Sequence, residues 1–173
     1  MSFTAQELDD IVTRRKNVQL SPHFSLNEMV ATSHTEINNW PQEAEIVQNL
    51  QRCCETLLET VRARYNKPIH VNSGYRCPAL NTKVHGSATS QHMTGDAVDF
   101  EIAGIANGDI CAWIRDNMTF GQLILEFYTL GQPSSGWVHC SAVPPPGHKA
   151  GEVLTAVKDA ATGKTKYLPG LHV

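Results

Sequence analysis

The sequence lacks an excess of positive charge and any long apolar segment. Its 14 Lys and Arg residues stand against 17 Asp and Glu, a net charge of −3, so no basic surface is available to neutralise phosphates. We therefore expect no nucleic-acid partner. No apolar run approaches the roughly 18 residues that cross a bilayer, which predicts that the chain does not insert into membranes. The opening residues, MSFTAQELDDIVTRRKN, lack the apolar core of a signal peptide, which predicts synthesis in the cytoplasm.

Cysteine is scarce, and its spacing does not suit a disulfide framework or a thiolate zinc site. The count of five is odd, Cys53 and Cys54 are adjacent on an expected helix, and no C-x-x-C pair occurs. Reduced thiols are the simplest interpretation. A metal site in this chain would therefore have to use His and carboxylate ligands.

No repeat, low-complexity tract or long linker divides the chain, so residues 1–173 are expected to form a single domain. Helical patterns come early and strand patterns dominate later. This order predicts an α+β fold with a mainly antiparallel sheet backed by helices. The expected strands are IHVNSGYR, AVDFEI, QLILEFY and GWVHCSAV, followed by a hairpin of EVLTAVK and KTKYLPG.

Three helices are expected from local patterns. Apolar residues at helical spacing predict a long amphipathic helix over about residues 41–65. Ser25 stands three positions before Glu28, the spacing of a capping box, and predicts a short helix there. A further helix is expected over 109–117, with Asn107 or Asp109 as its cap.

A polar segment that runs directly into a strand, SATSQHMTGDAVDFE, carries the first candidate site residues. His92 and Asp99 offer the nitrogen and oxygen ligands that zinc accepts, and Gly95 between them can supply the turn that folds the chain back. His139, in the expected strand GWVHCS, is the candidate third ligand. The alternative is that these are a hydrogen-bonded core His and a turn-capping Asp, and the spacing alone leaves both interpretations open.

Glu126 is the one charged residue in QLILEFY. Burial of an unpaired carboxylate costs free energy, so we expect this side chain to have a function or a partner. Burial raises a carboxyl pKa toward the range of a general base beside a metal; the alternative is a structural pair with an Arg. If QLILEFY and GWVHCS form a hairpin, the expected register sets Glu126 opposite His139 and Tyr128 opposite Trp137.

Arg76 follows a strand-ending turn and could hold a substrate carboxylate, although its position taken alone favours a surface Arg. The spare candidates for metal or base roles are His85, Asp96 and Glu101.

Taken together, the motifs resemble a known family. SGYRCPALN, then S-x-H-x-x-G-x-A-x-D from Ser90 to Asp99, then a strand glutamate and W-V-H are similar to the zinc D-alanyl-D-alanine peptidases of the hedgehog/DD-peptidase fold. The similarity is to the bacterial and phage branch and covers about residues 24–171. It implies that His92, Asp99 and His139 bind one zinc ion.

The resemblance also implies roles around the metal. Arg76 would grip the substrate's carboxylate, Ser90 would hydrogen-bond near the site, and Glu126 would be the general base. Some relatives carry an acidic residue three positions before the last His ligand, where this chain has Gly136.

The function implied is a zinc peptidase, working as a monomer, that hydrolyses peptidoglycan stem peptides beside D-amino acids, as a D,D-carboxypeptidase or an endopeptidase. Without a signal peptide, release through a phage holin, as for an endolysin, is the hypothesis for reaching the wall. The alternatives are a non-catalytic zinc-stabilised wall-binding module and a virion component.

Overall fold

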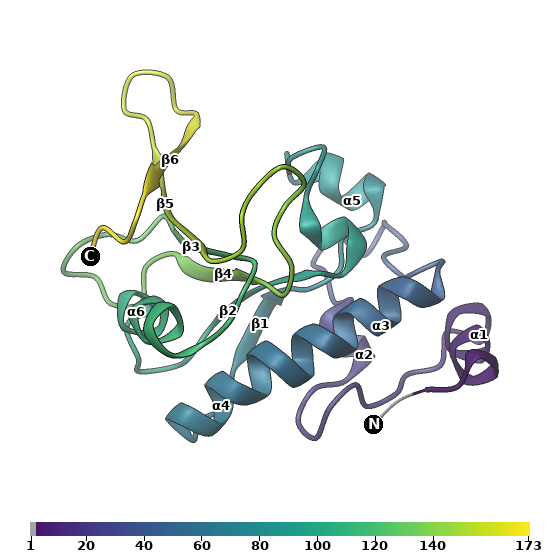
Figure 1. Cartoon of the computed structure of the whole chain (residues 1–173). Helices are drawn as coiled ribbons and strands as arrows, with labels where there is room; N and C mark the ends of the chain where they lie inside the picture. Colours follow the sequence, from purple (N-terminus) through teal and green to yellow (C-terminus); the bar gives the residue numbers. More distant parts are fainter. Residues whose placement is uncertain (1–2) are drawn as a thin grey trace.

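A computed structural model describes residues 3–173 and has a single six-stranded sheet at its centre (Figure 1). The strands lie in the order β1-β2-β4-β3-β5-β6, and every neighbouring pair is antiparallel except β3 and β5, which are parallel. The expected α+β fold with a mainly antiparallel sheet is confirmed. The strands are β1 (His70–Ser73), β2 (Ala97–Glu101), β3 (Gln122–Glu126), β4 (Trp137–Ser141), β5 (Glu152–Lys158) and β6 (Thr165–Pro169).

The long helix expected over about 41–65 is present, with an irregular middle. It begins at Ala44, passes through one π-helical turn at residues 54–58, and ends at Tyr65, where Asn66 takes a left-handed conformation. The helical elements are α1 (Ala5–Arg14), α2 (Leu26–Met29), α3 (Ala44–Cys53), η1 (Cys54–Leu58), α4 (Glu59–Tyr65), α5 (Pro78–Lys83), η2 (Gln91–Thr94) and α6 (Asn107–Asn117). None of these helices has the length and apolar content required to span a bilayer.

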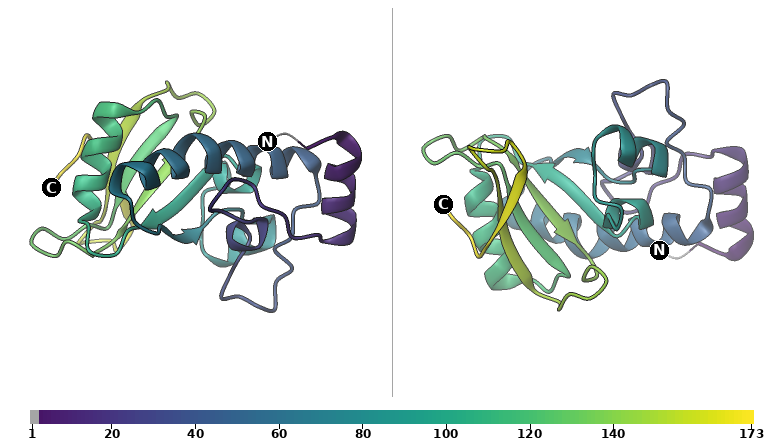
Figure 2. Two further views of the ribbon diagram at one scale, coloured as in Figure 1. Left: turned by 90° about the horizontal axis from the view of Figure 1, so that it is seen from below. Right: turned by 90° about the horizontal axis from the view of Figure 1, so that it is seen from above.

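The two faces of the sheet differ in what covers them. Seen from below, the long α3–α4 helix and α6 lie over one face, whereas the view from above leaves the strands at the β6 side uncovered (Figure 2). Side chains alternate along each strand, so the apolar set is directed toward the helices and the polar set toward the other face. Fully buried members of the apolar set are Val98, Phe100, Leu123, Leu125, Val138 and Cys140. The open face therefore carries the candidate site.

Some local predictions were wrong or incomplete. α1 was not expected, although Thr4 and Glu7 form a capping box at its start, with Thr4 N donating to Glu7 at 2.8 Å. Ser25 does cap α2, because its Oγ accepts from Glu28 N at 3.3 Å. The cap expected for α6 is wrong: Ala106 occupies the cap position, and Asn107 is buried.

The hairpin register also differs from the expected one. His139 lies opposite Ile124, and Glu126 lies opposite Trp137. The pairing is shifted by two residues because β3 ends at Glu126, where Phe127 turns into the left-handed region with φ 53°. The expected Tyr128–Trp137 pair is therefore replaced by a Phe127–Trp137 edge contact, with ring centroids 5.3 Å apart. Because the shift is an even number, Glu126 keeps the same face as His139.

Candidate active site

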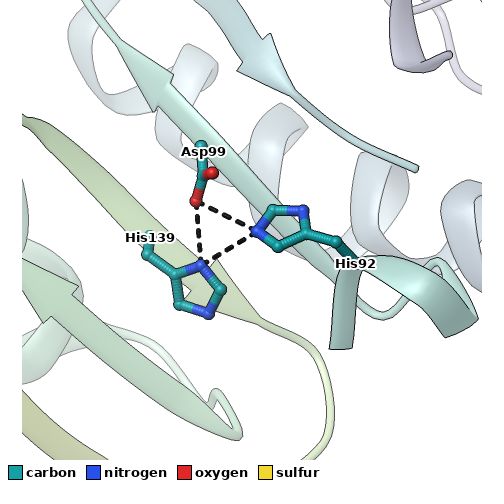
Figure 3. Close-up of side chains that lie close together, drawn as sticks. All are labelled: His92, Asp99 and His139. Atoms are coloured by element: carbon teal, nitrogen blue, oxygen red, sulfur yellow. Dashed lines mark hydrogen bonds and ion pairs between the residues drawn. The ribbon is translucent and has the colours of Figure 1, made fainter. Parts of the chain in front are cut away.

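Three buried side chains from three different elements meet on the open face of the sheet (Figure 3). His92 comes from η2, Asp99 from β2 and His139 from β4, and Asp99 and His139 are directly opposite one another in the antiparallel ladder. Gly95 ends η2 with φ 76°, which turns the chain back into β2. A Cβ at Gly95 would stand 2.8 Å from the backbone oxygen of Ile46, so glycine also permits the close approach of α3.

The atoms that face one another are those that a metal ion would need. Asp99 Oδ1 lies 2.8 Å from His139 Nδ1 and 3.2 Å from His92 Nε2, and the two ring nitrogens are 3.2 Å apart. Ligands held about 2.0–2.1 Å from a tetrahedral zinc stand roughly 3.3 Å from each other, so the three atoms need only small adjustments. Two nitrogens and one carboxylate oxygen are a donor set that suits zinc. The residues present therefore fit the ion.

Hydrogen bonding and charge hold His92 and Asp99 in the forms that bind metals. His92 Nδ1 lies 2.7 Å from the carbonyl oxygen of Gly74, and donation of its N–H there leaves Nε2 free to act as a ligand. Burial lowers the pKa of His92, against the attraction of Asp99, which favours the neutral ring. For Asp99, burial alone would raise the pKa, but His92 and the hydrogen bond with His139 together hold it well below the usual range. Asp99 is therefore ionised.

The side chain of Arg76 reaches the site, where it pairs with Asp99. A guanidinium nitrogen donates to Asp99 Oδ2, the oxygen that does not face the two histidines, and Nε donates to Ser73 Oγ at 2.8 Å. This pairing orients the carboxylate so that Oδ1 points between the rings. The sequence suggested Arg76 for substrate binding. It did not predict the contact with Asp99, because the two residues are far apart along the chain.

Glu126 stands at the end of β3 on the same sheet face. Burial, reinforced by the negative charge of Asp99, raises the pKa of Glu126 to about 7. The positions of Glu126 and His139 in the ladder are diagonal neighbours, which long side chains can bridge. A carboxyl group that titrates near neutrality beside a candidate metal centre has the properties of a general base.

Gly136 explains why the acid does not stand three residues before His139. Its φ is 64°, and a Cβ there would lie 1.8 Å from the backbone oxygen of Glu126. No side chain fits at that position. The acidic side chain on this face comes from the neighbouring strand β3, as Glu126.

The remaining candidates separate into those that reach the cleft and those that do not. Ser90 and His85 line the cleft, with Ser90 two residues before His92. Asp96 is held by Arg52 Nη2 at 2.5 Å and by Thr94 Oγ1 at 2.7 Å, which fastens η2 to α3, and it does not line the cleft. Glu101 ends β2 opposite His70 and is also absent from the lining.

The candidate site opens into a cleft of about 1130 Å³. One wall comes from α5 and the loop before η2, the floor from β2, β3 and β4, and the other wall from the β5–β6 hairpin. Sequence reasoning missed that this hairpin contributes Lys158 and Tyr167 to the cleft. The contribution could have been predicted from the alternation of side chains along the two strands, because that alternation sets Leu154, Lys158 and Tyr167 on one face.

Comparison with known proteins gives one family match. The model of the family described as peptidase M15 matches residues 22–141. This range holds α2 to β4 and every candidate site residue, and it ends before β5. Comparison with curated proteins yields no match.

Proposed function

The chain belongs to the peptidase M15 family of zinc peptidases, and on this premise we propose that it hydrolyses peptidoglycan stem peptides at a bond next to a D-amino acid. We propose that His92, Asp99 and His139 hold one zinc ion and that Glu126 is the general base. The observation that carries the proposal is the convergence of this cluster with a carboxyl group of pKa about 7 on one face of the sheet.

Zinc, when bound, acts as a Lewis acid on the scissile carbonyl and lowers the pKa of water from about 15.7 toward 7. Glu126 takes a proton from the attacking water and then delivers it to the leaving amine. In the metal-free protein, burial and the charge of Asp99 raise the pKa of Glu126, which favours a carboxyl group that can hold a proton and return it.

The other polar residues orient the participants. Arg76 holds Asp99 through Oδ2, and its remaining N–H groups are those left for a substrate carboxylate. Ser90 lines the cleft directly before η2, and we propose that its hydroxyl group hydrogen-bonds the substrate peptide.

Hydrolysis of purified cell walls tests the proposal. The wild-type protein should release stem-peptide fragments, a chelator should abolish the release, and zinc should restore it. Mass analysis of products from a defined muropeptide then identifies the bond and separates carboxypeptidase from endopeptidase action. Binding to walls with no fragment released, with or without zinc, would contradict the enzyme and support a wall-binding module. An endolysin role, expected from the sequence, is tested by host-cell lysis on co-expression with a holin.

A further inference from the structure

The β5–β6 hairpin forms one wall of the cleft, yet it lies beyond residue 141, where the family match ends. Its side chains alternate, so one set is directed toward the cleft. In the β5–β6 ladder, Lys158 pairs with Thr165 and Ala156 pairs with Tyr167. Lys158, Thr165 and Tyr167 all line the cleft. Nothing in the proposed mechanism uses them.

The ammonium group of Lys158 is held in place by two contacts. Nζ lies 4.8 Å from the centre of the Phe127 ring and donates to Thr165 Oγ1 at 3.2 Å. Phe127 adopts its left-handed conformation directly after Glu126, which brings its ring beneath the ammonium. An aromatic face stabilises a cation without neutralising its charge. The positive charge therefore lies at the cleft wall.

Lys158 differs from the other permanent cation of the cleft. Arg76 is paired with Asp99, whereas within residues 3–173 no carboxylate forms an ion pair with Lys158. Its charge acts on the reaction centre, since it lowers the pKa of Glu126 against the larger effects of burial and Asp99. Among the described residues that line the cleft, Lys158 is thus a cation outside any direct ion pair, on the hairpin side of Glu126.

We propose that Lys158, with the hydroxyl group of Thr165, is a subsite for a carboxylate of the substrate peptide. This inference rests on the proposed function and narrows its substrate class to stem peptides with a free carboxylate on the hairpin side of the cleaved bond. An ammonium group and a hydroxyl both donate hydrogen bonds to a carboxylate, and charge-assisted bonds are about twice as strong as neutral ones. The subsite selects an acid over its amide.

Pairs of synthetic stem peptides test the subsite, each pair identical except that one carboxylate is converted to an amide. The measurement is the ratio of kcat/KM for the acid to kcat/KM for the amide. In wild-type protein, at least one pair should favour the acid about tenfold, the size of one charge-assisted contact in a partly exposed site. Lys158→Met should bring that ratio close to one, and Thr165→Val should lower it by a smaller factor.

Lys166→Met is the matched control, because Lys166 belongs to the same hairpin but alternates to the opposite face. Its ratio should equal that of the wild type. No preference in any pair, or an unchanged ratio in Lys158→Met, would overturn the subsite.

Binding measurements keep this test separate from the proposed function. Zinc-loaded Glu126→Gln protein should bind the same peptides with the same preference in Kd, read by calorimetry. If the wild type cleaves none of the peptides, the proposed function fails, and the Kd ratios of Glu126→Gln with and without Lys158→Met still decide the subsite. If cleavage occurs without the acid preference, the function stands and the subsite is refuted.

Discussion

In the metal-free protein, Glu126 should make stability fall as the pH rises from about 4.5 to about 7. Burial, then the charge of Asp99, raises the pKa of Glu126 from 4.5 to about 7 in the folded state. Between these values the folded protein holds a proton that the unfolded chain releases. The stabilising contribution is therefore complete below 4.5 and lost as the pH passes through 7. The full effect is about 3 kcal/mol, because one pKa unit corresponds to about 1.4 kcal/mol.

His92 acts with the opposite sign in an overlapping range. Burial lowers its pKa from 6.5, so its contribution is present above 6.5 and is lost as the pH falls. The free energy of unfolding, measured as a function of pH, therefore contains contributions from both Glu126 and His92. Subtraction of the curve for Glu126→Gln cancels the His92 contribution, because both proteins contain that residue.

The assay is denaturant unfolding of both proteins with a chelator present, from about pH 4 to about pH 8. The free energy of unfolding of Glu126→Gln relative to wild type should rise across this range by about 3 kcal/mol. Parallel curves for the two proteins would refute the claim that Glu126 is removed from water and holds its proton near neutrality.

Substitutions at four positions test the site and its backbone. His92→Ala and Asp99→Ala should each lose stoichiometric zinc, because two protein ligands hold the ion too weakly; full zinc in both by metal analysis would reject the ligand set. Glu126→Gln should keep zinc but lose on the order of 10²-fold or more in kcat on a stem peptide, and a near-normal kcat would assign the base elsewhere. Gly136→Ala should lower the free energy of unfolding by more than Gly147→Ala. Both glycines have positive φ, which costs a residue with a Cβ about 1–2 kcal/mol. A Cβ at Gly136 would also lie 1.8 Å from the backbone oxygen of Glu126, whereas a Cβ at Gly147 would have no atom within 4 Å. Equal losses in thermal unfolding would show that the close contact is relieved without strain.

The sequence predicted what depends on local pattern. The amphipathic helix over 41–65 follows from apolar spacing, and the strand over 97–101 follows from alternation. The cluster of His92, Asp99 and His139 was expected as a set, because the motif fixes two members and the strand pattern suggests the third.

What the sequence left undetermined depends on contacts between distant segments. The partner of Arg76 is 23 positions away along the chain, and no local pattern identifies it. The register of β3 against β4 was two residues off, since a left-handed Phe127 ends the strand earlier than the apolar run suggests. The sequence allowed a metal or base role for Asp96, but its carboxylate pairs with Arg52 and does not line the cleft.

The pairing of β3 with β4 leaves the tip of the loop between these strands, at Leu130 and Gly131, as a place where the length of the chain is free to vary. The two residues are positioned by ladder hydrogen bonds rather than by the connecting segment, whose tip at Leu130 is 79% exposed. Exposed loop tips accept insertions that strands do not. A peptide inserted between Leu130 and Gly131 should leave the cluster intact, which makes this tip an attachment point for a tag or a binding module. One residue inserted inside β4 would instead turn His139 to the opposite face.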